Sequence, residues 1–239
     1  MKQRIWELDA FRGICILGMV IVHLTFDLVY LYGTLTLGAF GDALYTIVTQ
    51  WGGVLFLLLS GICVTLGSHP VKRGLIVFGA GMICTLVTAG MYLGGMMAKG
   101  IIIYFGVLHC LGICMLLWPL LKKLPVWGIG LLGIAIIAVG FYIKQFRVDT
   151  PLLVPFGWMP HFFASSDYFP ILPNLGYFLM GTVLGRTLYR KKTTLFSRVN
   201  PRNPIIQCCN FFGKHSLPIY LLHQPLVYAV IYGYILWRY

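Results

Sequence analysis

Charge is scarce in this chain. Only 10% of the 239 residues are charged and six are acidic, whereas 59% are hydrophobic. A water-soluble fold of this size could not bury so large an apolar fraction. Spans of about 20 residues each would also use up the chain and leave no room for a separate soluble domain. The composition therefore predicts an integral membrane protein with a single transmembrane domain over residues 1–239.

Several motifs are also missing. The sequence has no GxxxxGK[ST], GxGxxG, HExxH or GxSxG pattern, which argues against an ATP-driven pump or a membrane metalloprotease of a known motif class. The N-terminus mixes both charge signs and has no small-residue cleavage site, so we do not expect it to act as a signal peptide. The seven cysteines are an odd number and most lie in apolar stretches, so no disulfide framework is implied. Cys110 and Cys114 have no accompanying ligand cluster, and we expect no metal.

The apolar residues form long runs, most of them sufficient to cross about 30 Å of hydrocarbon. The sequence predicts an all-α polytopic bundle of about seven transmembrane helices, at residues 11–33, 43–66, 74–93, 100–121, 124–143, 168–189 and 213–236. Residues 144–167 and 190–212 form the two longer connections.

The distribution of basic residues predicts the orientation. With a cytoplasmic N-terminus and an extracytoplasmic C-terminus, the outer side carries only Lys99, Lys144, Arg147 and Arg238. The cytoplasmic side then carries Lys2, Arg4, Arg12, Lys72, Arg73, Lys122, Lys123, Arg186, Arg190, Lys191, Lys192, Arg198, Arg202 and Lys214. This is a strong positive-inside bias. The net charge of +12 is thus mainly a topology signal and argues against a nucleic-acid partner. The basic segment 190–212 faces membrane lipids or an anionic cofactor.

The first span contains two costly ionisable residues, His23 and Asp27. They are one helical turn apart, a spacing at which a carboxylate can orient an imidazole as a general base. Arg12 precedes His23 by about three turns, or about 16 Å along the axis. The structural alternative is that His23 and Asp27 only satisfy polar groups within the bundle. Ionisable groups inside hydrocarbon usually line a cavity or a substrate path, which favours a function.

Other candidates lie along the chain. His109 and His223 fall in spans at comparable depth, and with Gln224 they are predicted to line a polar cavity, although each alone fits a hydrogen-bonded core residue equally well. His161 and Asp167 lie near the outer mouth, where solvated loop residues are the alternative. Phosphate groups of a cytoplasmic ligand would meet Arg12, with Arg4 and Arg73 as weaker candidates. Membrane anchoring explains the last two residues equally well.

Four segments resemble bacterial proteins related to the catalytic domain of heparan-alpha-glucosaminide N-acetyltransferase. They are Glu7-Leu-Asp-Ala-Phe-Arg-Gly13 followed by His23, then Phe105-Gly-Val-Leu-His109, the segment 167–186 that opens Asp167-Tyr-Phe-Pro170, and Gly213-Lys-His-Ser-Leu-Pro-Ile-Tyr-Leu-Leu-His-Gln-Pro225. The arginine and histidine separated by ten residues also resemble the signature of the broader transmembrane acyltransferases that modify envelope sugars. Segment 34–42 lacks the histidine held to be catalytic in the eukaryotic enzyme, so its heparan substrate does not carry over.

The resemblance implies an acyltransferase of the bacterial cytoplasmic membrane. Such an enzyme takes an acetyl group from cytoplasmic acetyl-CoA and delivers it to an envelope saccharide or lipid-linked glycan. His23 would be the general base or acyl carrier, with Arg12 on the CoA side. Two alternatives stay open: a proton-coupled transporter or flippase with His23, Asp27, His109 and His223 as a proton relay, and a non-catalytic scaffold. A homodimer is also compatible with the sequence.

Overall fold

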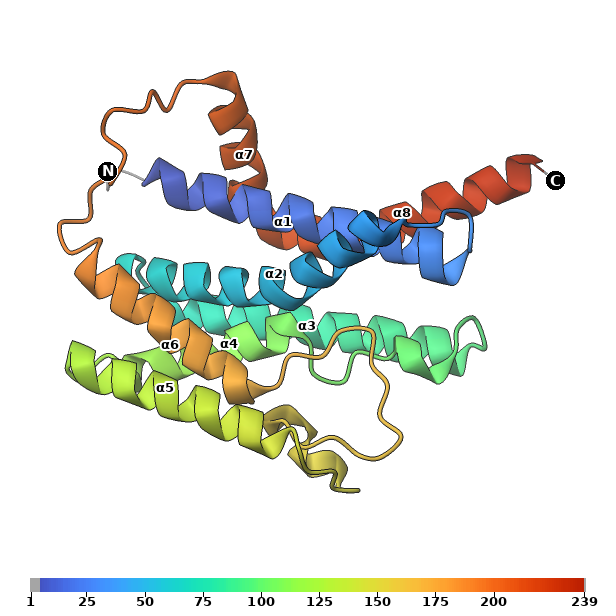
Figure 1. Cartoon of the computed structure of the whole chain (residues 1–239), viewed down its shortest axis with the longest axis horizontal. Helices are drawn as coiled ribbons and strands as arrows, with labels where there is room; N and C mark the ends of the chain where they lie inside the picture. The colour runs from blue at the N-terminus through green and yellow to red at the C-terminus, as the bar shows by residue number, and fades with distance from the viewer. Residues whose placement is uncertain (1–4, 239) are drawn as a thin grey trace. The chain divides into compact units, whose positions relative to one another are not determined.

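The computed structural model describes residues 5–238, with the side chains of 30, 31, 232 and 234–238 left aside. This part of the chain is helical and contains no β-strand, which confirms the predicted all-α class (Figure 1). Its contacts divide the chain into two compact units. The first comprises Met1–Phe56 and Thr193–Tyr239, and the second comprises Leu57–Lys192.

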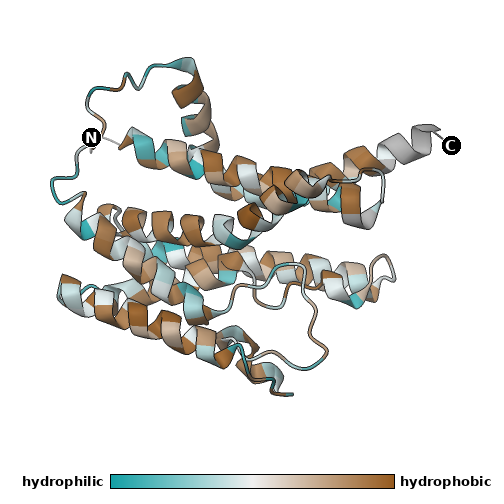
Figure 2. Ribbon diagram, viewed as in Figure 1, coloured by the Kyte–Doolittle hydropathy of each residue, from teal (hydrophilic) through white to brown (hydrophobic). Residues whose placement is uncertain are grey.

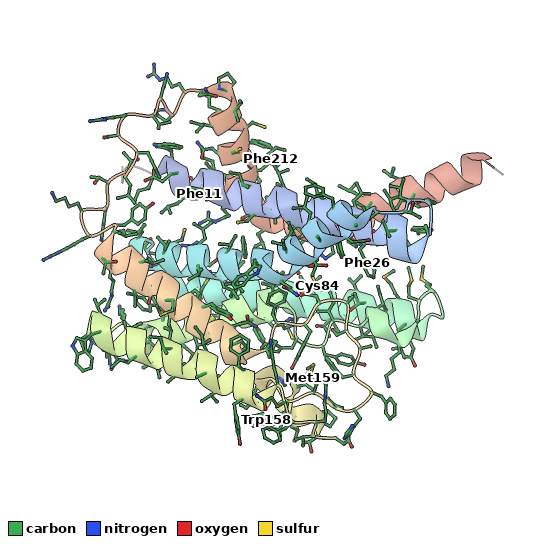
Figure 3. All side chains as sticks on the ribbon, viewed as in Figure 1. Phe11, Phe26, Cys84, Trp158, Met159 and Phe212 are labelled. Carbon is green, nitrogen blue, oxygen red and sulfur yellow. The ribbon has the colours of Figure 1, made fainter. Side chains whose placement is uncertain are left out.

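Four helical segments within the described residues are long and apolar enough to cross a membrane. They are Trp6–Val29, Ala39–Leu66, Pro70–Leu93 and Val126–Ile143. The helices are largely brown in Figure 2, as expected for residues that face lipid. Phe11 and Phe26 on α1, labelled in Figure 3, are 49% and 47% exposed, which suits contact with hydrocarbon. The chain is therefore an integral membrane protein.

The other three predicted spans also contain helices, but shorter ones. They are α4 (Val107–Leu121), α6 (Ile171–Thr187) and the apolar part of α8, Ser216–Ile231. A seven-span count and its orientation stay predictions.

The first unit is built around α1 (Trp6–Phe26), which continues as a π-helical turn, η1 (Asp27–Leu31). It also contains the start of α2 (Ala39–Leu66), together with α7 (Pro204–Lys214) and α8 (Ser216–Arg238). Helix α1 packs against α7 and α8. A Cβ on Gly13 would lie 1.9 Å from the Cys209 carbonyl oxygen, and a Cβ on Gly213 would lie 1.8 Å from that of Asp9. Only glycine allows the α1 and α7 backbones to approach so closely.

Helix α7 corrects the prediction that residues 190–212 form a loop. Pro204 occupies the first turn, where its missing N–H costs nothing, and the Asn203 side chain accepts a hydrogen bond from the Ile205 N–H at 2.9 Å. At 11 residues, α7 is too short to register as a membrane span. One of its faces is apolar, and the helix is stabilised by packing on α1.

The second unit contains the end of α2, α3 (Pro70–Leu93), α4, α5 (Val126–Ile143) and α6. Helix α3 packs on α4, α5 packs on α6, and α6 also contacts α4. Gly61 and Gly181 let the α2 and α6 backbones touch, since added Cβ atoms would lie 2.1 and 2.0 Å from opposing carbonyl oxygens. The fully buried core side chains include Leu57, Ile129, Phe178 and Leu179.

A cation closes the turn between α4 and α5. The Arg186 guanidinium donates hydrogen bonds to the carbonyl oxygens of Lys122 and Leu124 and lies 5.2 Å from the Trp118 ring centroid. A cation near a helix C-terminus stabilises the carbonyls left without intrahelical partners. This positively charged residue therefore has a defined packing role.

The glycine contact between α1 and α7 predicts a stability effect. Gly13→Ala should lower the melting temperature of the purified protein, because a methyl group cannot fit against the Cys209 carbonyl without a backbone shift. Overpacking of this kind costs about 1–3 kcal/mol. Gly18→Ala on the same helix is the matched control, since its Cβ meets nothing within 4 Å and alanine favours helix. Equal melting temperatures for the two variants would contradict the packing described.

Candidate active site

The end of α1 changes its helical geometry at the predicted ionisable residues. The backbone widens into the π-turn η1 at Asp27, whose carbonyl oxygen accepts from the Tyr32 N–H at 2.9 Å. Asp27 is only 2% exposed. Single π-turns inside α-helices occur frequently at functional sites. The first span thus has an irregular end, and His23 lies one turn before it.

His23 is hydrogen-bonded to a second histidine of the same unit. Its Nδ1 lies 3.1 Å from the Nε2 of His223 on α8, and the two ring centroids are 4.9 Å apart. The Met19 sulfur is 2.9 Å from the same His23 Nδ1. On α8, the His223 Nδ1 lies 2.7 Å from the Tyr220 carbonyl oxygen. Two residues 200 positions apart in the chain therefore form one imidazole pair.

Asp27 has a different partner from the one the sequence suggests. The spacing in the first span predicts that Asp27 orients His23, but the Asp27 Oδ2 accepts a hydrogen bond from the Gln224 Nε2 at 3.0 Å. The predicted contact between Asp27 and His23 was wrong because the spacing argument considered only one helix. Helix α8 packs on α1 and supplies Gln224 as the partner of Asp27. His23, Asp27, His223 and Gln224 form one polar cluster between α1 and α8.

The cluster retains an unused acceptor. Among the described residues, the Gln224 Oε1 is buried and has no hydrogen-bond partner. A buried amide oxygen without a hydrogen bond costs free energy. The Gln224 Oε1 is therefore suited to accept a hydrogen bond from an O–H or N–H group of a ligand.

The start of α1 holds its charged residues in fixed positions. The Arg12 Nη1 lies 3.3 Å from the Asp9 Oδ1 and forms an ion pair with it. Glu7 is 1% exposed and its Oε1 accepts from the Leu195 N–H at 2.8 Å, which ties α1 to the segment before α7. Arg4 lies outside the described residues. Arg73, in the second unit, is exposed at the start of α3.

His109 and Asp167 both cap the N-terminus of α4 in the second unit. The His109 Nδ1 accepts from the Gly106 N–H at 3.1 Å, and its Nε2 lies 3.3 Å from the Thr85 hydroxyl. The Asp167 Oδ2 accepts from the Val107 N–H at 3.0 Å. Both ring nitrogens of His109 are thus used, and the orphan amides of a helix start are paired. These contacts support the structural interpretation of His109 and Asp167.

The loop between α5 and α6 contains the last predicted residue, His161. Its side chain is exposed and its backbone N–H donates to the Asp149 Oδ1 at 3.2 Å. Nearby, the Tyr168 hydroxyl donates to the Val154 carbonyl oxygen at 2.7 Å. The loop, which includes the labelled Trp158 and Met159 of Figure 3, is held by bonds of its own.

Of the predicted site residues, the structure brings His23, Asp27, His223 and Gln224 together. The pairing of His23 with His223 was not predicted. Local spacing within the first span has no information on which distant histidine packs against it. Within residues 5–238, no three His, Cys, Asp or Glu side chains are arranged so that they could hold a metal ion.

The similarity to known proteins extends over most of the chain. The family described as heparan-alpha-glucosaminide N-acetyltransferase, catalytic, matches residues 4–225. The chain belongs to this family. Membership implies a transmembrane acetyltransferase, in agreement with the apolar helices. No curated protein and no solved structure matches the chain.

The capping contact at α4 predicts a stability effect rather than a catalytic one. Asp167→Ala should destabilise the protein by about 0.5–2 kcal/mol, the usual cost of losing a side-chain cap. Thermal unfolding of the purified protein measures it. Asp149→Ala is the control, because Asp149 is exposed and caps no helix. Unchanged stability of Asp167→Ala together with lost acetyl transfer would instead favour the substrate-cavity role predicted from the sequence.

Proposed function

We propose that this family member transfers an acetyl group from cytoplasmic acetyl-CoA to a hydroxyl or amino group of an extracytoplasmic or lipid-linked saccharide, with His23 as the base. The observation that carries the proposal is the polar cluster of His23, His223, Asp27 and Gln224 between two apolar helices, in which Asp27 is buried and the other three side chains are half-buried. Groups of this kind are costly in hydrocarbon and mark substrate paths by default. Family membership supplies the reaction type.

His23 suits a base because one nitrogen of its ring stays available. Its contacts to Met19 and His223 both involve Nδ1. The Nε2 can therefore take the proton of the acceptor hydroxyl or amine as that atom attacks the acetyl carbonyl carbon. The new bond forms as the thioester C–S bond breaks, and the proton leaves His23 for the CoA thiolate. An acetyl group carried transiently by His23 is the two-step version of the same reaction.

The unpaired Gln224 Oε1 offers a second contact to the acceptor, since it can accept a hydrogen bond from a saccharide hydroxyl or amine. The hydrogen bond between the Gln224 Nε2 and Asp27 keeps the Gln224 side chain turned toward α1.

The anionic end of the donor requires cations at the cytoplasmic side. Arg12 is the best candidate, because Asp9 holds its guanidinium and a fork of N–H donors suits phosphate. Its side chain is 18% exposed, so part of it is accessible to a ligand. Arg73, which is exposed, is a weaker candidate for the same phosphate groups. Arg4 is proposed as another such candidate from the sequence alone.

The remaining features of the proposal follow the sequence. They are one acyltransferase domain over residues 1–239, seven spans with the N-terminus in the cytoplasm and the C-terminus outside, a bacterial cytoplasmic membrane, and His109, Asp167 and His161 toward the acceptor side. The basic residues between α6 and α7 would meet anionic lipids. A homodimer is compatible with this arrangement.

Removal of the base should abolish the reaction. Purified wild-type protein incubated with labelled acetyl-CoA should release CoA or become acetylated, and His23→Ala should lower that rate by about 10²–10⁴-fold, the usual contribution of a positioned base. His69→Asn is the control, because His69 is exposed in the α2–α3 turn at a φ of 55°, which asparagine tolerates. Full activity of His23→Ala would exclude His23 as base or carrier.

The same experiment separates the alternatives. A hydrogen-bonded histidine pair is also a possible proton relay, so a transporter or flippase is the second candidate. It predicts no acetyl transfer by the wild type and proton-coupled solute movement in vesicles that His23→Ala abolishes. A scaffold predicts neither, and cells with His23→Ala would keep every envelope modification.

The proposed orientation is tested with single cysteines in a cysteine-free background. A cysteine at Lys191 should be labelled by an impermeant thiol reagent only from the cytoplasmic side, and one at His161 only from outside, because both positions are exposed and lie in loops. The reverse labelling, or labelling of both from one side, would contradict the seven-span topology.

A further inference from the structure

The hydrogen bonds around the histidine pair determine which nitrogens carry protons. A carbonyl oxygen only accepts, so the His223 Nδ1, 2.7 Å from the Tyr220 oxygen, must carry a hydrogen. In neutral His223 the Nε2 is then an acceptor. Its partner at 3.1 Å, the His23 Nδ1, must therefore be the donor. The Met19 sulfur at 2.9 Å from that nitrogen is a weak acceptor and agrees with this direction.

From this chain of bonds we propose that His223 is a positioning residue that holds His23 in the Nδ1–H tautomer, with the Nε2 lone pair free to receive a proton. The role of His223 in catalysis rests on the proposed function of His23 as base. The assignment of the His23 tautomer does not depend on that function. The chain of hydrogen bonds begins at the backbone carbonyl oxygen of Tyr220. The position of that oxygen is fixed by helix α8 and does not depend on a titrating side chain.

The arrangement replaces the carboxylate that usually orients a catalytic histidine. Asp27 would be the obvious orienter, but its carboxylate is hydrogen-bonded by Gln224. A neutral imidazole in its place avoids an additional anion inside the apolar bundle, which would be costly. When the His23 Nε2 takes the acceptor's proton, the charge stays on His23. Its Nδ1–H remains hydrogen-bonded to the His223 Nε2, which stabilises the imidazolium without taking up the proton.

The tautomer is measurable without any activity. In purified full-length protein labelled with ¹⁵N-histidine, protonated and unprotonated ring nitrogens resonate at well-separated frequencies. The wild type should show a His23 Nδ1 with a proton and a His23 Nε2 without one, assigned by loss of the signals in His23→Ala. A His23 that carries its proton on Nε2 would overturn the proposal outright, whatever the enzyme does.

Two variants of His223 give the matched comparison. In His223→Gln the amide oxygen lies near the position of the imidazole Nε2 and still accepts from His23, whereas His223→Leu has no acceptor. His223→Leu should lose the Nδ1–H tautomer and lower kcat by at least about 100-fold with an unchanged KM for acetyl-CoA. His223→Gln should keep the tautomer and lie within about tenfold of wild type. A merely structural role predicts no rescue by glutamine and no change of tautomer.

The readouts separate the failure of this inference from the failure of the proposed function. A wild type with the predicted tautomer and a fully active His23→Ala would contradict the function and leave the tautomer in place. Loss of the tautomer in His223→Leu with unchanged kcat would show that His223 orients His23 without a catalytic consequence and would overturn its role in the reaction. If His223→Leu does not fold, the wild-type spectrum and His223→Gln still decide.

Discussion

A polar group inside an apolar bundle must find its partner within the protein, and the arrangement of this chain follows from that constraint. Water is absent from the hydrocarbon region, so each unpaired donor or acceptor there costs free energy. His23 is paired with His223, Asp27 with Gln224, and Glu7 with the Leu195 amide. In the second unit His109 and Asp167 pair the first amides of α4. Apart from the local bond of His109 to Gly106, each of these bonds draws distant parts of the chain together.

Such pairing requires close helices, and glycine provides the approach. At Gly13 and Gly213 the α1 and α7 backbones are in direct contact, and Gly61 and Gly181 do the same for α2 and α6. Without a hydrophobic driving force between helices in lipid, this contact area and the buried hydrogen bonds are the main attractive interactions. In the first unit, the α1–α7 contact thus fixes the helix that carries His23, and a catalytic site needs such fixed distances.

The sequence predicted the helical class and located the ionisable residues, because composition and hydrophobic runs are local properties. It missed α7, whose 11 residues fall below the length of a span, and it assigned the wrong partner to Asp27. The capping role of His109 had no usable signal, because Gly106 has no side chain and the run Gly106-Val-Leu-His109 lacks the Ser or Thr and the Glu or Gln of a capping box.

The separation of the paired histidines in the chain bears on how the protein is made. His23 leaves the ribosome 200 residues before His223. At about 5–20 residues per second, roughly 10–40 s pass between the synthesis of the two. During that time the first helix is inserted with an imidazole whose final partner does not yet exist. The cluster is therefore completed only when α8, which supplies His223 and Gln224, packs on α1.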